Sequence, residues 1–87
     1  MAYWIEFLPR AARQLTALPK SAQIYIGRRI DGLKDDPRPP GVALLHGEDR
    51  TYRVRAGDYR ILYQILDERL LVIIVRIGNR RDVYRDR

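Results

Sequence analysis

The sequence predicts an α+β fold in which one strand and a two-helix hairpin precede a three-stranded antiparallel meander, with both helices on one face of the sheet. Three observations support this: apolar residues alternate near both ends of the chain, they recur at helical spacing between residues 9 and 35, and very short turns separate the last three strands. Such turns leave no room for a crossover, so these strands must be antiparallel. We expect residues 1–87 to form a single domain.

The N-terminal half begins with an expected strand over residues 3–7, where Tyr, Ile and Phe alternate with Trp and Glu. Pro9 suits the first turn of a helix, and Pro19 interrupts that helix. A second helix is expected from about Lys20 to Asp35, before Pro37. Its apolar stripe, which we expect to face the sheet, consists of Ile26, Ile30 and Leu33.

The C-terminal half predicts a Pro-rich loop over residues 38–41, beneath which Leu44 and Leu45 are expected to pack. Strands are expected at residues 51–56, 59–66 and 69–77, with turns at residues 57–58 and 67–68. The last strand is apolar enough to lie inside the sheet. We expect Gly78 to end it, before a polar tail over residues 79–87. The sheet face away from the helices is then free to be a working surface.

Charge is the most informative feature of the composition. Seventeen Lys and Arg face eleven Asp and Glu, giving a formal net charge of +6, and fifteen of the seventeen are Arg. A basic domain suits nucleic acid or an acidic protein partner, and Arg is favoured for planar, bidentate contact with phosphate. Solubility and a codon bias toward Arg would produce the same composition.

Other residue types exclude several classes of protein. The absence of cysteine removes disulfides, thiolate nucleophiles and Cys-based metal sites, and one His with scattered acids makes no zinc or two-metal site. We therefore expect no metal and no cofactor. We expect no signal peptide, and the longest apolar stretch, residues 70–75, is too short for a membrane span. A cytoplasmic protein without a membrane partner is expected.

The predicted hairpin brings arginines together. A turn at residues 57–58 places Arg55 opposite Arg60, and Arg53 lies two residues along the same face. Like charges directly opposite each other are destabilising, so an anion among the three guanidiniums, such as a phosphate, would stabilise the patch. The alternative is that the stems splay and the charged heads stay solvated.

The tail adds Arg80, Arg81 and Tyr84 just past the last strand. Arg80 and Tyr84 are close enough in sequence to reach one site. There Tyr84 can stack on an unpaired base, or it can simply pack the chain end onto the sheet. His46, the only histidine, is expected to be a loop residue without a catalytic role.

Two segments resemble a known superfamily. Residues 52–63, with the sequence YRVRAGDYRILY, closely resemble the signature of the RelE/ParE toxin superfamily, and so do residues 75–84, VRIGNRRDVY. The order of elements also agrees, so the resemblance covers essentially the whole chain. It implies a RelE-like fold and a toxin of a type II toxin–antitoxin system.

The resemblance also implies a branch. RelE-like members cleave messenger RNA in the ribosomal A site, whereas ParE-like members share the fold, inhibit DNA gyrase and lack most catalytic positions. This sequence resembles the cleaving branch, because its residues match the catalytic-type positions: Arg60, Arg80 and Tyr84. Arg53 and Arg55 fall where RelE-like toxins carry basic residues, often lysines. With Arg81, they are expected to bind RNA.

The implied activity is that of a metal-independent endoribonuclease. The 2′-OH of the RNA would attack its own phosphodiester, with Arg60 and Arg80 stabilising the developing charge and Tyr84 orienting or stacking a base. Arginine cannot readily lose a proton, and Asn79 stands where many relatives carry histidine, so the general base is unassigned. The alternatives are a ParE-like DNA gyrase inhibitor and a non-cleaving RNA-binding toxin homologue.

The resemblance implies three partners: messenger RNA, the ribosome and a cognate RelB-like antitoxin. The charge of +6 suits an acidic, partly disordered antitoxin segment that folds as it binds. We expect this segment to cover or displace the Arg80–Tyr84 tail. The alternative is an antitoxin that leaves the site open and makes the toxin too bulky for the ribosomal A site.

Overall fold

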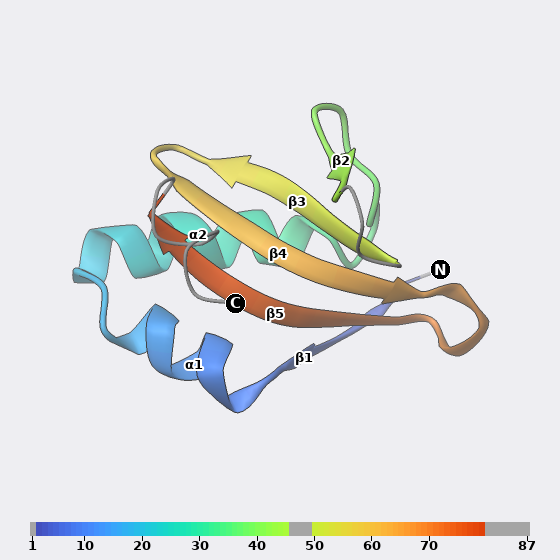
Figure 1. Ribbon diagram of the computed structural model, residues 1–87, viewed down its shortest axis with the longest axis horizontal. Coiled ribbons are helices and arrows are strands. Elements are labelled where there is room, and N and C mark those ends of the chain that lie inside the picture. Colours follow the sequence, from blue (N-terminus) through green and yellow to red (C-terminus); the bar gives the residue numbers. More distant parts are fainter. Residues whose placement is uncertain (1, 46–49, 80–87) are drawn as a thin grey trace.

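The chain begins with a short strand, β1 (Trp4–Phe7), followed by two helices, α1 (Pro9–Thr16) and α2 (Lys20–Gly32) (Figure 1). After a loop come β2 (Ala43–Leu44), β3 (Thr51–Ala56), β4 (Tyr59–Leu66), a 3₁₀-helix η1 (Asp67–Arg69) and β5 (Leu71–Asn79). These elements are those of a computed structural model that describes residues 2–45 and 50–79. The predicted α+β fold is confirmed.

The strands of the described chain form one sheet in the order β1-β5-β4-β3-β2. β3, β4 and β5 are antiparallel neighbours, and β5 lies inside the sheet, as the sequence predicts. β1 pairs in parallel with β5 and forms one edge. The other edge is β2, which the sequence analysis missed. Leu44 in β2 is 61% exposed, so the expectation that it packs beneath the loop is wrong.

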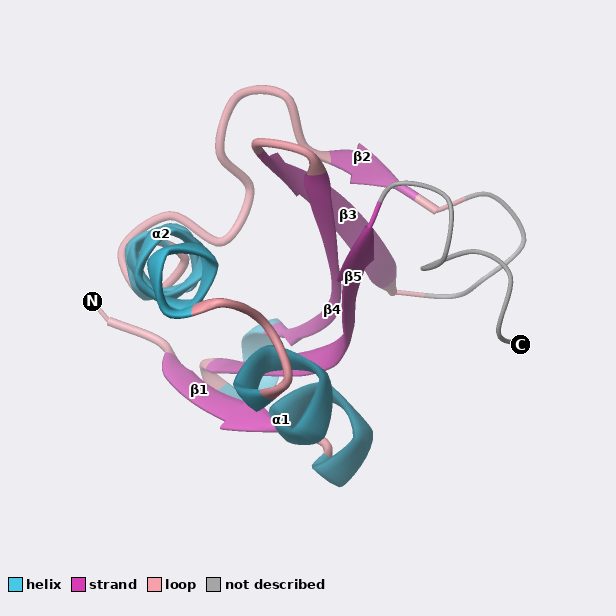
Figure 2. Cartoon of the chain, turned by 90° about the vertical axis from the view of Figure 1, so that its left-hand side faces the viewer, coloured by secondary structure: helices cyan, strands magenta, loops and turns pink. Residues whose placement is uncertain are grey.

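Both helices cover the same face of the sheet (Figure 2). Pro9 occupies the first turn of α1, and α2 begins directly after Pro19, in agreement with the sequence. The buried core joins both helices to the three long strands, with members such as Ala11, Ile26, Val54, Ile61 and Ile74. None of the described helices is long and apolar enough to cross a membrane. None of the described helices covers the opposite face of β3, β4 and β5.

A side chain from α1 anchors the end of β5. β1 pairs with β5 only as far as Phe7 opposite Ile74, so no strand of the described residues pairs with the following part of β5 on that side. There, Gln14 Oε1 accepts a hydrogen bond of 2.8 Å from the backbone N–H of Ile77. A buried backbone donor left unpaired would cost free energy. Gln14 thus holds the part of β5 that continues through Gly78, which the sequence analysis had expected to end the strand.

Candidate functional site

The open face of the sheet carries arginines from adjacent strands. In β3, Val54 and Ala56 lie in the core. Arg53 and Arg55 alternate with them, so they point away from the helices, and both are exposed. The β3–β4 register pairs Arg55 with Arg60, which confirms the predicted pairing. The three arginines therefore share the open face.

β5 adds a fourth arginine to this surface. Leu62 of β4 lies opposite Arg53 on one side and opposite Arg76 on the other, so these residues form one row across three strands. The sequence analysis did not select Arg76, although a charge inside an otherwise apolar strand was a usable signal. We call the surface formed by these four side chains the arginine face: Arg53, Arg55, Arg60 and Arg76.

Arg60 is recessed in the arginine face. It is only 8% exposed, whereas Arg53 and Arg55 are exposed. It lies on β4, the middle strand of the described sheet, and its partner on β5 is Gly78, which has no side chain. Arginines are rarely buried unless paired, yet no Asp or Glu of the described residues lies within ion-pair distance of Arg60. A guanidinium in this position favours an anion as its partner.

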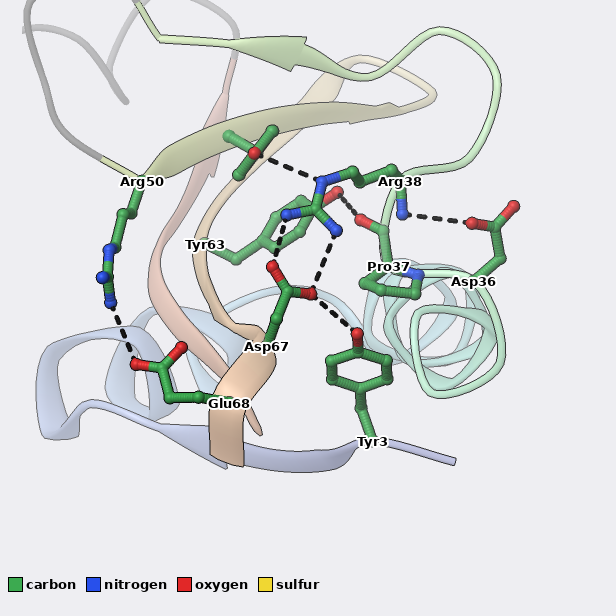
Figure 3. Close-up of polar contacts among 9 residues, drawn as sticks. Tyr3, Asp36, Pro37, Arg38, Arg50, Tyr63, Asp67 and Glu68 are labelled. Atoms are coloured by element: carbon green, nitrogen blue, oxygen red, sulfur yellow. Dashed lines mark hydrogen bonds and ion pairs between the residues drawn. The ribbon is translucent and has the colours of Figure 1, made fainter. Parts of the chain in front are cut away.

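A second polar cluster lies at the other end of β4, around η1 (Figure 3). Arg38 donates two hydrogen bonds to Asp67, with distances of 3.1 Å from Nη1 to Oδ1 and 2.8 Å from Nη2 to Oδ2. The Tyr3 hydroxyl donates to the same Oδ1 at 2.7 Å, and Arg38 Nε donates to the Tyr52 hydroxyl at 3.3 Å. We call these four residues the Asp67 clasp. It links the residue before β1, the loop before β2, β3 and η1.

The Asp67 clasp offers no acid–base chemistry near neutral pH. Hydrogen bonds from Arg38 and then from Tyr3 lower the pKa of Asp67 to about 2, and the bond to Asp67 raises the pKa of Arg38. Beside the clasp, burial raises the pKa of Tyr63, whose hydroxyl donates to the Pro37 carbonyl at 2.7 Å. Among the residues that the structure describes, no three His, Cys, Asp or Glu side chains gather into a metal-binding group. The clasp therefore joins separate segments of the chain by hydrogen bonds and offers no site for such chemistry.

The sequence of the chain matches a known family. The family described as "ParE toxin of type II toxin-antitoxin system, parDE" matches residues 5–84. The chain belongs to the RelE/ParE toxin superfamily. It is 35% identical to Toxin RelG of Mycobacterium tuberculosis, over 98% of this chain and 99% of RelG. It is 27% identical to the mRNA interferase toxin RelE of Escherichia coli K12, over 97% of this chain and 92% of that protein.

Comparison with solved structures also places the chain in the RelE/ParE superfamily. The toxin–antitoxin complex RelBE2 of Mycobacterium tuberculosis contains a chain that is 30% identical, with a TM-score of 0.82, covering 92% of this chain and 100% of that one. These similarities confirm the RelE-like branch and the RelE-like fold that the sequence predicts. The chain is a RelE-family toxin of toxin–antitoxin systems.

The structure describes half of the positions predicted for the site of this RelE-like toxin. It brings together Arg53, Arg55 and Arg60, as predicted. The other three predicted positions, Arg80, Arg81 and Tyr84, lie outside the described residues, and so does His46, for which no catalytic role was expected. Because β5 extends to Asn79, Arg80 follows directly in the chain after the strand that carries Arg76. The catalytic and RNA-binding roles of all six positions stay predictions.

Proposed function

We propose that this RelE-like toxin is a metal-independent endoribonuclease that cuts messenger RNA in the ribosomal A site. The recessed Arg60 guanidinium, with the exposed Arg53 and Arg55 beside it in the sheet register, is the observation that carries the proposal. The name of the E. coli relative, mRNA interferase toxin RelE, supports the same substrate.

The proposed reaction is attack of a ribose 2′-OH on the adjacent phosphorus. The bond from phosphorus to the 5′-oxygen breaks, leaving a 2′,3′-cyclic phosphate and a free 5′-OH. Arg60, recessed and preorganised, stabilises the charge that develops on the phosphate oxygens, with Arg80 as a second donor. Tyr84 orients a neighbouring base.

The arginines around Arg60 have a positioning role in this proposal. Arg53 and Arg55 are exposed and hold flanking phosphates, and Arg81 binds the RNA from the tail. None of them can readily give up a proton, since the pKa of arginine exceeds about 12. Ordering of the RNA by the ribosome then supplies much of the rate by positioning the 2′-OH.

The test uses purified toxin, ribosomes with an empty A site and a messenger RNA analysed by primer extension. We expect one A-site cut, and no cut when the nucleotide before the scissile bond carries a 2′-deoxyribose. Metal independence is measured on a free oligoribonucleotide in EDTA, because ribosomes need Mg²⁺. Inhibition of DNA gyrase without RNA cleavage would support the ParE-like alternative. RNA binding without cleavage would support the non-cleaving one.

We also propose that an acidic, RelB-like antitoxin anchors apolar side chains in a groove between β1 and α2. The groove has a volume of about 560 Å³, and its lining includes Trp4, Phe7 and Ile30. Trp4 is 76% and Phe7 39% exposed, so two large apolar side chains of the same groove face solvent, as in the apolar patches typical of interaction sites. The chain with the same fold in RelBE2 belongs to a toxin–antitoxin complex, which supports an antitoxin as the kind of partner. Apolar anchors would supply most of the affinity, and charge would speed association.

Trp4→Ala tests the groove. Buried Trp anchors are often hot spots worth about 2 kcal/mol or more, so we expect roughly 30-fold weaker binding of the protein encoded next to the toxin, measured by calorimetry. Leu44→Ala is the matched control, because Leu44 is also exposed and apolar but lies outside the groove. Equal effects of the two substitutions would contradict the proposal that the antitoxin binds in this groove. Whether the antitoxin also covers or displaces the Arg80–Tyr84 tail stays a prediction.

A further inference from the structure

A separate pocket lies where α2 meets the turn between β3 and β4. Its volume is about 530 Å³. We call it the turn pocket, and its lining residues are Tyr25, Arg28, Arg29, Arg55 and Gly57. Only Arg55 has a role in the cleavage proposed above, so most of the pocket is unexplained by that reaction.

The two walls of the turn pocket are in contact. Gly57 has a φ of +63°, as the first central residue of a type II′ hairpin turn requires. A Cβ atom at Gly57 would lie 3.2 Å from Cε2 of Tyr25, so this ring packs directly on the turn. Arg29 Nε donates a hydrogen bond of 3.2 Å to the Arg55 carbonyl, which also ties α2 to β3. The pocket is thus formed by two joined elements of the fold.

The charge of the turn pocket is not neutralised within the described protein. No Asp or Glu among residues 2–45 and 50–79 lies within ion-pair distance of Arg28, Arg29 or Arg55. Elsewhere the protein does pair its arginines, as the 2.8 Å contact between Arg38 and Asp67 shows. Arg28 and Arg29 bring two guanidiniums to one cavity, and a bound phosphate would offset the repulsion between them through charge-assisted hydrogen bonds.

Tyr25 adds a second kind of contact. Although its ring touches the turn, Tyr25 is 55% exposed. An exposed aromatic ring beside arginines suits stacking of an unpaired base, next to a phosphate held by guanidiniums. Double-stranded nucleic acid has no free base to offer such a ring. The combination therefore favours a single strand.

We propose that the turn pocket binds a phosphate of single-stranded RNA, with an adjacent base stacked on Tyr25. This inference rests on the proposed function, because the RNA is the strand that the arginine face would cut. Arg55 connects the two surfaces: its carbonyl accepts the hydrogen bond from Arg29 at the pocket, and its side chain lies on the arginine face opposite Arg60. An RNA strand that crosses the arginine face at Arg60 can therefore continue around the β3–β4 turn into the turn pocket. The pocket extends the RNA contact beyond the cleavage site.

The test measures binding of a fluorescent 2′-O-methyl oligoribonucleotide, which cannot be cut because its 2′-oxygens are blocked. Association constants are measured by fluorescence polarisation over a series of salt concentrations. Each phosphate contact to a single strand contributes about 0.7 to the slope of log K against log salt. We expect Arg28→Ala to lower the slope by about this amount and Tyr25→Ala to weaken binding about tenfold or more with the slope unchanged. Arg13→Ala, which removes an exposed arginine of α1 outside the pocket, is the control.

The outcomes separate the pocket from the cleavage proposal. If Arg28→Ala and Tyr25→Ala bind like Arg13→Ala while the unmodified toxin cuts RNA, the pocket proposal is wrong and the proposed function stands. If the unmodified toxin binds but never cuts, and the pocket variants lose affinity as stated, the pocket proposal stands and cleavage is wrong. Inorganic phosphate is titrated while the Gly57 amide is followed by NMR. A phosphate response without any effect of Arg28→Ala on RNA binding would identify a site for free phosphate and overturn the RNA proposal.

Discussion

Replacing Arg60 with Ala tests the centre of the arginine face. Loss of one preorganised charge-stabilising donor lowers kcat by about 10²–10³-fold, or roughly 3–4 kcal/mol. Two effects on folding oppose each other. The substitution removes the packed stem of a side chain that is only 8% exposed. It also relieves repulsion from the directly opposed Arg55, worth roughly 0.2–1 kcal/mol. We therefore expect cleavage to fall by about 100- to 1000-fold, with a change in the free energy of unfolding of about 1 kcal/mol or less.

Single-turnover cleavage on ribosomes with saturating toxin separates chemistry from binding, and urea unfolding followed by circular dichroism measures stability. Arg69→Ala is the matched control, since it removes the same charge from an exposed position in η1. Arg60→Lys keeps the charge but loses the planar fork, so it should restore only part of the rate. A folded Arg60→Ala variant that cuts within about threefold of the unmodified toxin would refute the role given to Arg60.

Three further predictions concern stability and RNA binding. Tyr63→Phe leaves the buried Pro37 carbonyl without its 2.7 Å donor and should cost about 1–3 kcal/mol in urea unfolding; an unchanged midpoint would contradict this. The pKa of Asp67 is lowered from 3.8 to about 2 in the folded protein, so its contribution to stability is present above about pH 4 and is lost as the pH falls toward 2. Asp67→Asn should flatten that part of the stability–pH curve, and equal curves would show that the bond to Arg38 is not responsible. Arg53→Ala should weaken RNA binding more than chemistry, reducing the salt slope by about 0.7; a lower rate at saturation would place Arg53 in the chemistry.

The order of the helices and strands could be predicted because each element depends on the pattern of residues within its own segment. The alternation in residues 51–56 and the Pro residues around the helices are visible in the sequence. The parallel pairing of β1 with β5 could not be predicted, since a strand's neighbour depends on tertiary packing. β2 has only two residues, too few for any periodicity. The start of β5 was placed too early because residues 67–69 form a 3₁₀-helix and Leu70 has a φ of +49°.

The pairing of Arg55 with Arg60 could be predicted for a different reason. A two-residue turn fixes the register of the hairpin, and the register fixes which side chains face each other. The burial of Arg60 could not be predicted, because it depends on the strand order. That order places β4 in the middle of the described sheet and Gly78 of β5 beside Arg60. The turn pocket depends on where α2 packs, so no spacing within the sequence indicates that Tyr25 packs on Gly57.

The distribution of ion pairs bears on the two explanations that composition leaves open for the net charge of +6. If arginines served solubility alone, pairing with acids should not depend on position. Around η1, however, Arg38 pairs with Asp67, and Arg50 pairs with Glu68 at 3.4 Å. At the other end of the hairpin, Arg55 instead lies opposite another arginine. This arrangement is unfavourable for folding alone. It becomes favourable when a polyanion lies along this end of the sheet, so the position of the arginines, more than their number, supports RNA as the ligand.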